Sequence, residues 1–201
     1  MRPIFQNKDL EIAFVGSTAI VGMELFPRTS RDTDAHGAPH LTVAEARTIL
    51  NEIADGEGLV VQEKGWGTIA VANLDEDGDP RWEVDLLVPE RGPIPTEAAR
   101  RIHELAQETD IGPTAIPEHV LVTKAIAHGD CHRDKEDEKA QQYENDLLQL
   151  DKELGEDIDW EEVKQLLDAF PTTRVRDAAA KLREVFGVDL GYDQGPDRSI
   201  A

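Results

Sequence analysis

A short apolar stretch that runs into a Gly-Ser pair is the feature that most limits how this chain can fold. Residues Ile12–Val15 have the length and composition of a buried strand, and Gly16 and Ser17 follow as a tight turn. Residues Thr18–Phe26 then have helical spacing and stop at Pro27. This succession of strand, turn and helix predicts the start of an α/β domain.

The following segments continue the alternation of strand and helix patterns. Thr42 and Glu45 form a capping-box pair, which predicts a helix over residues 42–55. Strands are predicted at 59–63, 68–73 and 81–88, and the Asp-Gly turn in LDEDGDP joins the last two as a hairpin. Helices are predicted at 96–108, 117–128 and about 133–154, and Asp159 and either Thr172 or Thr173 are expected to cap two more.

These patterns together predict an α/β fold of the α+β type. We expect a short mixed sheet with packed helices in residues 1–112, which form the catalytic core. A C-terminal helical bundle in residues 113–201 is expected to close one side of the substrate cleft.

The charge of the chain restricts its partners. Its 201 residues include 42 acidic and 21 basic ones, and the formal net charge of -21 argues against general affinity for nucleic acid. A salt-rich, halophilic cytoplasm explains this acidity, and a basic partner protein is the alternative that we favour less. No apolar run is long enough to cross a bilayer and no secretory signal is recognised, so we expect a cytoplasmic protein without membrane contact. The single cysteine, Cys131, cannot form an internal disulfide.

Two aspartates lie two residues apart shortly after the first predicted helix. In an extended strand, Asp32 and Asp34 would project to the same side. Parallel carboxylates repel each other unless a cation neutralises them, and Mg²⁺ prefers oxygen ligands. The alternative is a solvated turn after Pro27 that binds no metal.

A third aspartate, Asp85, interrupts the apolar strand RWEVDLLVP. If this strand lies next to the one that carries Asp32 and Asp34, the three carboxylates form a site able to hold two Mg²⁺ ions. The alternative is an ion pair between Asp85 and a nearby arginine such as Arg81. The backbone N–H groups of Gly16 and Ser17 would bind the phosphates of a nucleoside triphosphate.

The order of these motifs resembles the nucleotidyltransferase superfamily related to DNA polymerase β. Gly-Ser, then Arg28, Ser30, Asp32 and Asp34 in the spacing Arg-x-Ser-x-Asp-x-Asp, then a strand aspartate, is similar to the AbiEii and MenT class of toxin-antitoxin nucleotidyltransferases. The later stretch IPEHVLVTKAIAHGDCHRDKEDE is similar to that class as well. The resemblance covers roughly residues 10–150.

The resemblance implies a reaction in which an acceptor hydroxyl attacks the α-phosphorus of a nucleoside triphosphate and pyrophosphate leaves. It assigns Asp32, Asp34 and Asp85 to metal binding and catalysis, and the residues expected at the nucleotide are Gly16, Ser17, Arg28, Ser30, Lys124 and Arg133. Glu136 stands where the family's Arg-x-Lys-Asp motif has its aspartate. Without the resemblance, Lys124 would be a surface lysine and Arg133 part of a solvated helix face.

The acceptor is left open by the sequence. The resemblance implies an RNA end or a protein side chain, together with an antitoxin partner, while an antibiotic-modifying adenylyltransferase and a catalytically silent binding module are the alternatives. A zinc site at His128, Asp130, Cys131 and His132 is not expected, because no second Cys or His pair has structural-zinc spacing.

Overall fold

The computed structural model describes residues 10–27, 32–65 and 67–192, and the chain divides into two compact units, Met1–Ile116 and Pro117–Ala201. The division lies beyond the expected boundary at residue 112, because that boundary cuts into a strand that belongs to the sheet of the first unit.

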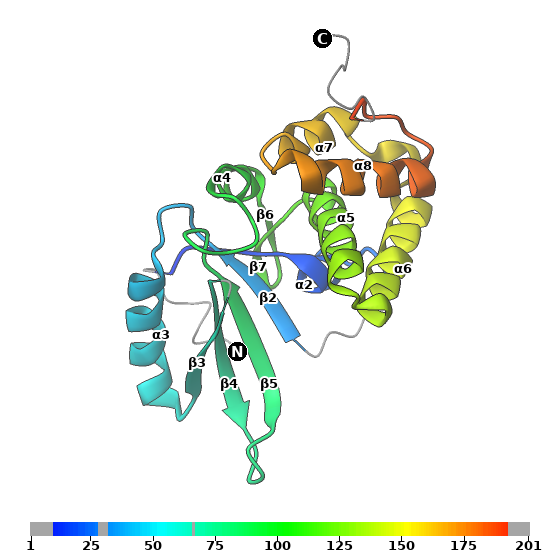
Figure 1. Ribbon diagram of the computed structural model, residues 1–201. Coiled ribbons are helices and arrows are strands. Elements are labelled where there is room, and N and C mark those ends of the chain that lie inside the picture. Colours follow the sequence, from blue (N-terminus) through cyan, green and yellow to red (C-terminus); the bar gives the residue numbers. More distant parts are fainter. Residues whose placement is uncertain (1–9, 28–31, 66, 193–201) are drawn as a thin grey trace. The chain divides into compact units, whose positions relative to one another are not determined.

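The first unit contains both strands and helices, as its sequence pattern predicts (Figure 1). Its described elements, in chain order, are β1 (Ile12–Phe14), α2 (Gly16–Gly22), β2 (Asp32–Gly37), α3 (Val43–Glu57), β3 (Val60–Gly65), β4 (Thr68–Leu74), β5 (Pro80–Leu87), α4 (Thr96–Leu105), β6 (Gln107–Thr109) and β7 (Gly112–Thr114).

The strands form one mixed sheet of seven strands in the order β3-β4-β5-β2-β1-β7-β6. β2 pairs with β5 and β1 pairs with β7 in parallel, and the remaining pairs are antiparallel. The predicted mixed sheet and the meander β3-β4-β5 are therefore confirmed. β6 and β7 were not expected, because a pair of three-residue strands such as Gln107–Thr109 and Gly112–Thr114 carries too short a pattern to recognise.

Helix α3 covers one face of the sheet. The predicted capping box is present: the Thr42 side chain accepts from the Glu45 N–H, and the Glu45 carboxylate accepts from the Thr42 N–H. The helix ends at Glu57 and is capped by Gly58, whose φ of 66° lies in the left-handed region. Its inner side packs on alternate strand residues, among them Ile69, Val71, Val84 and Leu86. These side chains and those of the helix form the core of the unit.

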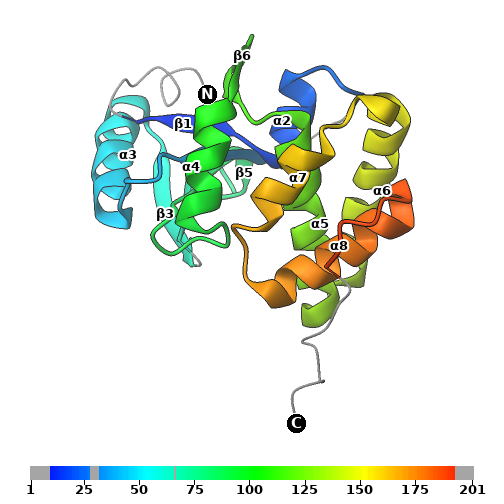
Figure 2. The same cartoon turned by 90° about the horizontal axis from the view of Figure 1, so that it is seen from above.

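The opposite face of the sheet carries the residues that alternate with this core. Figure 2 shows α4 running across β1, and the His103 ring of α4 lies edge-on to the His36 ring of β2 at 6.1 Å between centroids. Nε2 of His103 is 3.0 Å from the carbonyl oxygen of His36. Helix α4 therefore covers one end of β2 on this face.

Helix α2 differs from its predicted range of 18–26. It begins at Gly16 and ends at Gly22, because Met23 closes its last turn and Glu24 takes a left-handed φ of 54°. The apolar side chains at 25 and 26 are therefore outside the helix, although their spacing fits a continued one.

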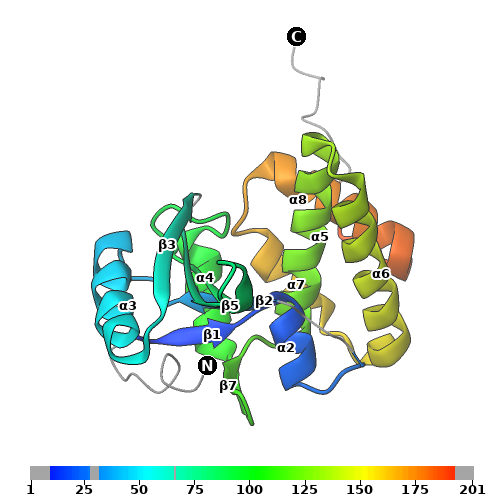
Figure 3. The ribbon, with the colours of Figure 1, turned by 90° about the horizontal axis from the view of Figure 1, so that it is seen from below.

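The described part of the second unit is helical. Its elements are α5 (Pro117–Asp134), α6 (Asp137–Leu154), η1 (Gly155–Asp157), α7 (Trp160–Leu167) and α8 (Thr172–Phe186). Figure 3 shows α5 and α6 side by side, and α5 also packs against α7 and α8. In the described residues, no helix is both long enough and apolar enough to span a membrane.

Two predicted boundaries in this unit are wrong. Helix α5 continues to Asp134, and the break comes at Lys135, which has a left-handed φ of 62°, so the residues near 133 end one helix instead of starting the next. Asp159 caps α7 as predicted, through hydrogen bonds from the N–H groups of Glu161 and Glu162. Thr172 does not cap α8; it is the first helical residue, after Pro171.

The buried His36 should make the protein sensitive to acid. Burial, with a smaller effect of His103, lowers the pKa of this imidazole to about 4. Because the unfolded chain binds the proton near pH 6.5, the stability that neutral His36 provides is complete above pH 6.5 and is lost as the pH falls toward 4. At about 1.4 kcal/mol per pKa unit, this loss is about 3 kcal/mol.

We therefore expect the free energy of unfolding of the wild type to fall about 3 kcal/mol more than that of His36→Asn over this pH range. Urea unfolding at several pH values measures the difference. His40→Asn, at an exposed loop position, should keep the wild-type pH dependence. Parallel curves for the wild type and His36→Asn would contradict the assignment.

Candidate active site

The parallel pairing of β2 with β5 brings two of the three predicted carboxylates together. Asp34 is the register partner of Asp85, and Asp32 is the partner of Glu83. Paired residues on adjacent strands project to the same face of a sheet, so Asp34 and Asp85 lie on one side. Val84 and Leu86, which flank Asp85, are buried in the core on the side of α3. The carboxylates therefore lie on the face that α3 does not cover.

Asp34 is held by the turn that follows β1. Its N–H donates to Oγ1 of Thr18 at 2.9 Å, and its carbonyl oxygen accepts from the N–H of Val15 at 3.1 Å. Gly16 has a φ of 59°, and a Cβ at this position would lie 2.9 Å from Oδ2 of Asp34. Two independent constraints, the left-handed backbone and the close carboxylate, thus favour glycine here.

Lys64 of β3 places a positive charge beside the Asp85 carboxylate. Its Nζ lies 3.0 Å from Oδ1 and 3.2 Å from Oδ2 of Asp85, and it also pairs with Glu83. The register of β3 against β4 shifts between Glu63 and Gly65, so Lys64 is the extra residue of a β-bulge. A bulge re-aims its side chain, which explains how Lys64 reaches across β4 to β5.

The Lys64 ammonium is a stable charge in this position. Burial works against it, but the hydrogen bonds to Glu83 and Asp85 raise the pKa of Lys64 above its ordinary value. The side chains of Glu83 and Asp85 are 16% and 19% exposed, so they are mostly buried but keep some contact with solvent. This face is therefore a half-buried acidic surface that already attracts a cation.

Several predicted residues fall partly or wholly outside the described structure. Asp32 begins β2, and only its backbone is described; Arg28 and Ser30 lie outside the described residues. Among the described side chains, no three His, Cys, Asp or Glu residues are placed to hold a metal ion. The described carboxylates of this face alone therefore do not form a complete ligand set.

The two cations predicted to bind phosphate lie in the helical unit. Lys124 is buried, its Nζ lies 2.6 Å from Oδ2 of Asp146, and it stands 5.3 Å from the centroid of the Tyr143 ring. Lys124 is thus not the surface lysine that its sequence context alone predicts. Its ammonium is directed by a carboxylate from α6.

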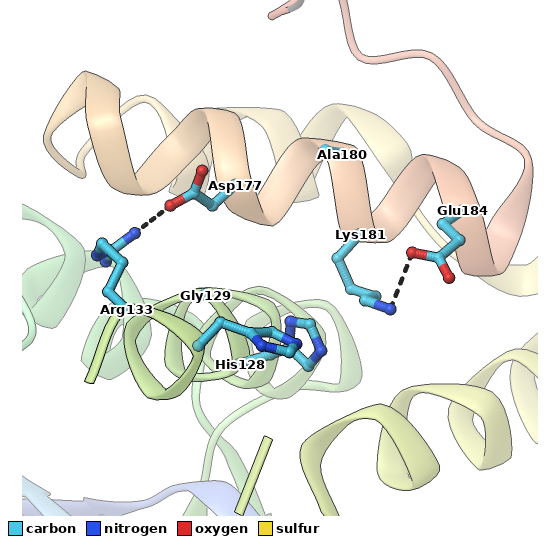
Figure 4. Close-up of a pocket in the computed structure, with 8 residues that line it drawn as sticks. His128, Gly129, Arg133, Asp177, Ala180, Lys181 and Glu184 are labelled. Carbon is cyan, nitrogen blue, oxygen red and sulfur yellow. Dashed lines mark hydrogen bonds and ion pairs between the residues drawn. The ribbon is translucent and has the colours of Figure 1, made fainter. Parts of the chain in front are cut away.

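Arg133, near the end of α5, is engaged by two carboxylates. Its guanidinium pairs with Asp177 of α8 (Figure 4). It also pairs with Asp130 of the same helix. Asp130 also accepts hydrogen bonds from Arg174, at 3.2 Å from Nε and 2.5 Å from Nη2. Arg133 therefore joins α5 to α8 through ion pairs that stay exposed, in keeping with the predicted solvated helix face.

Four residues with a place in these arrangements were missed from the sequence: Thr18, Lys64, Glu83 and Asp146. Glu83 could have been found, because it is two residues before Asp85 in the same strand and shares its face. Lys64 and Asp146 act through contacts between elements, and neither has a local signal in its own segment.

Comparison with known proteins adds little to this geometry. No protein-family model matches the chain, and no curated protein matches it. One similar solved structure is an antigenic nucleotidyltransferase-like protein from Paracoccidioides brasiliensis, with 12% identity, 89% coverage of each chain and a TM-score of 0.44. A similarity of this size is too weak to support an argument about function, which must come from the residues themselves.

The contact between Gly16 and Asp34 can be tested with two glycine variants. Gly58→Ala should lose about 1 kcal/mol of unfolding free energy from backbone strain alone, because nothing lies within 4 Å of a Cβ there. Gly16→Ala should lose about 0.5–1.5 kcal/mol more, because the end of the Asp34 side chain must move out of its preferred position. Chemical unfolding measures both values. Equal losses would show that position 16 carries backbone strain and no further constraint.

The role of Lys64 can be tested by removing its charge. Lys64→Met should bind Mg²⁺ roughly fivefold more tightly than the wild type. In the wild type, Mg²⁺ must break the partly exposed ion pair between Lys64 and Asp85, which contributes up to about 1 kcal/mol. Isothermal titration at constant ionic strength measures the affinity. Lys152→Met changes the net charge equally at an exposed position of α6 and should leave the affinity unchanged. A similar gain in both variants would contradict local competition at Asp85.

Proposed function

We propose that this chain is a Mg²⁺-dependent nucleotidyltransferase that moves a nucleotidyl group from a nucleoside triphosphate to an acceptor hydroxyl. The observation that supports it best is the parallel register of β2 and β5, which pairs Asp34 with Asp85 on one face of the sheet. The motif order through Asp32 and Asp34 adds the third carboxylate of the proposed site.

The residues of this face fit a magnesium ion. Their donors are carboxylate oxygens, and Mg²⁺ is typically held by one or two carboxylates together with substrate phosphates. The Lys64 ammonium at Asp85 and Glu83 shows that the acidic face attracts a positive charge at this place. Mg²⁺ bound there would neutralise charge on the phosphates and lower the pKa of the acceptor hydroxyl.

The proposed reaction is a single displacement at phosphorus. The acceptor oxygen forms a bond to the α-phosphorus while the bond from the α-phosphorus to the pyrophosphate oxygen breaks, and pyrophosphate leaves. The carboxylate of Asp85 takes the proton of the acceptor hydroxyl and passes it to solvent. Asp34, whose backbone is fixed by Thr18 and Val15, would hold together with Asp32 the Mg²⁺ that neutralises the reacting phosphate, and the backbone of Gly16 and Ser17 would bind the triphosphate.

Lys124 is the proposed phosphate-binding cation of the helical unit. Asp146 fixes its ammonium, so a triphosphate would have to share this cation with the carboxylate or displace it. Arg28 and Ser30 are also proposed to bind the nucleotide, because they belong to the Arg-x-Ser-x-Asp-x-Asp motif. Arg133 keeps a proposed role at the phosphates on the same terms, because a triphosphate would have to exchange with Asp130 and Asp177, which hold its guanidinium.

The acceptor that we propose is an RNA end or a protein side chain, as in the toxin class that the motifs resemble. The net charge of -21 opposes the approach of RNA in dilute buffer, and salt screening weakens this repulsion. Incubation with labelled nucleoside triphosphates and total RNA, protein extract or an aminoglycoside panel separates the acceptor classes. Labelling of the aminoglycoside alone would replace the toxin-like proposal with antibiotic modification.

The catalytic carboxylates can be tested by neutral substitutions of equal size. Binding of a nucleoside triphosphate by the wild type should require Mg²⁺ and should be lost in Asp34→Asn. Asp85→Asn should reduce transfer about a thousandfold, because metal-assisted displacement supplies several kcal/mol of transition-state stabilisation. Asp55→Asn, on the exposed side of α3, is the matched control and should behave as wild type.

Isothermal titration with each triphosphate, with and without Mg²⁺, gives the binding result, and release of labelled pyrophosphate gives the rate. Metal-independent binding, or full transfer by Asp85→Asn, would contradict the proposed mechanism. Absence of any metal-dependent binding by the wild type would favour a catalytically silent binding module instead.

A further inference from the structure

A pocket of the helical unit lies between α5 and α8. Its volume is about 410 Å³, which is in the usual range for small-molecule sites. Its polar lining consists of two imidazoles, two cations and two carboxylates: His128, His132, Arg133, Lys181, Asp177 and Glu184. Figure 4 shows the pair of Arg133 and Asp177 at one end and the pair of Lys181 and Glu184 at the other. The formal charges of this lining cancel, so the accessibility of each group decides which ligand the pocket can take.

His128 has an unsatisfied nitrogen in this lining. The residue is 5% exposed, and its Nε2 is buried without a hydrogen-bond partner. The titratable groups that interact with its ring come from three helices: Lys181 and Glu184 of α8, Glu144 of α6 and His132 of α5 itself. Burial, and to a smaller extent Lys181 and His132, lower the pKa of His128, so the ring is neutral at pH 7 and has one N–H to donate. A ligand oxygen that accepted this N–H would remove the cost of an unpaired buried group.

Lys181 is the buried cation of the pocket. Its side chain is 9% exposed, and its Nζ lies 3.2 Å from Oε1 of Glu144 and 2.9 Å from Oε2 of Glu184. Burial opposes the charge, but the hydrogen bonds to these two carboxylates raise the pKa of Lys181 above its ordinary value. The ammonium therefore stays charged near His128, and a charged donor next to a neutral imidazole donor suits an anion.

The carboxylates that engage these cations at the pocket are open to solvent. The Glu184 side chain is 64% exposed and the Asp177 side chain is 48% exposed, whereas that of Glu144 is 27% exposed. Exposed ion pairs contribute little free energy, and a carboxylate that is already hydrated loses little when it turns fully into solvent. An anion can therefore replace Glu184 at Lys181 while Glu144 keeps its hydrogen bond.

We propose that this pocket binds a small phosphate-bearing molecule, whose phosphate oxygens replace the Glu184 carboxylate at Lys181 and accept a hydrogen bond from Nε2 of His128. The exposed His132 adds a second imidazole donor. Phosphate suits this set of donors because its oxygens can accept from several directions at once. The volume of the pocket leaves room for a second phosphate group or an ester, which Arg133 can bind after exchange with Asp177.

The site belongs to the helical unit alone, and binding there needs no metal ion. It extends the role proposed above for Arg133, but it stands without the transfer reaction and without the carboxylates of the sheet. The net charge of -21 opposes the approach of any anion, and salt weakens this repulsion. Affinities are therefore compared at one ionic strength.

Removal of the buried cation and removal of the exposed carboxylate should have opposite effects. Lys181→Met should weaken pyrophosphate binding about tenfold or more, because a hydrogen bond from a charged donor is lost. Glu184→Gln should tighten it roughly fivefold, because the anion no longer displaces a charged competitor. Lys152→Met and Glu153→Gln make the same charge changes at exposed positions of α6 and should leave the affinity unchanged.

Calorimetric titration of the full chain with sodium pyrophosphate measures these affinities. EDTA is present, so that no Mg²⁺ carries the anion to the acidic face of the sheet. Parallel titrations with inorganic phosphate and with a nucleoside triphosphate distinguish free phosphate from phosphate esters as the ligand.

The His128 imidazole reports where the anion binds. An anion at Nε2 stabilises the protonated ring, so pyrophosphate should raise the pKa of His128. Proton NMR measures this pKa from the ring C–H signals that disappear in His128→Asn. The exposed His40 of the other unit should keep its pKa.

Circular dichroism shows whether each variant folds, and the exposed Glu184→Gln decides the result if Lys181→Met does not fold. Tighter binding by Glu184→Gln together with a raised pKa of His128 would support the proposal, whatever the outcome for nucleotidyl transfer. Absence of pyrophosphate binding by the wild type, an unchanged affinity in Glu184→Gln, or a pKa of His128 that does not respond to the anion would overturn it.

Discussion

The parallel pairing of β2 with β5 is the constraint on which the candidate site depends. It places Asp34 beside Asp85 and pairs the backbone of Asp32 with that of Glu83, so acidic residues accumulate on one face of the sheet. Such an accumulation is unfavourable unless positive charge compensates it. The bulged Lys64 provides part of this compensation, and the alternating apolar residues on the other face provide the packing that keeps the two strands together.

Much of the first unit could be predicted because its signals are local. The capping box of Thr42 and Glu45 and the Asp-Gly hairpin between β4 and β5 depend on residues a few positions apart, and both were found. The short strands β6 and β7 depend on pairing with each other and with β1, which no three-residue pattern reveals. The end of α2 was also predicted wrongly. Phe26 continues the apolar spacing of a helix, but the helix has already ended at Gly22 and the backbone at Glu24 is left-handed.

The chemistry of the candidate residues was harder to predict than their positions. Asp34 and Asp85 could be placed on one face from strand periodicity and motif order, but their contacts with Gly16 and Lys64 come from other elements. The same holds in the helical unit, where Lys124 is paired with Asp146. In a chain this acidic, such cations are held by carboxylates before any ligand arrives, so a bound phosphate or metal must exchange with an ion pair that already exists.

The bulge at Lys64 also affects how copies of the chain meet. β3 is the outermost strand on its side of the sheet, where an unbroken row of N–H and C=O groups would offer a template for a strand from another molecule. The register shift between Glu63 and Gly65 interrupts that row, and the charged side chains of Glu63 and Lys64 at this place make further pairing costly. The residue that serves the acidic face thus also protects the open side of the sheet from intermolecular strand addition and aggregation.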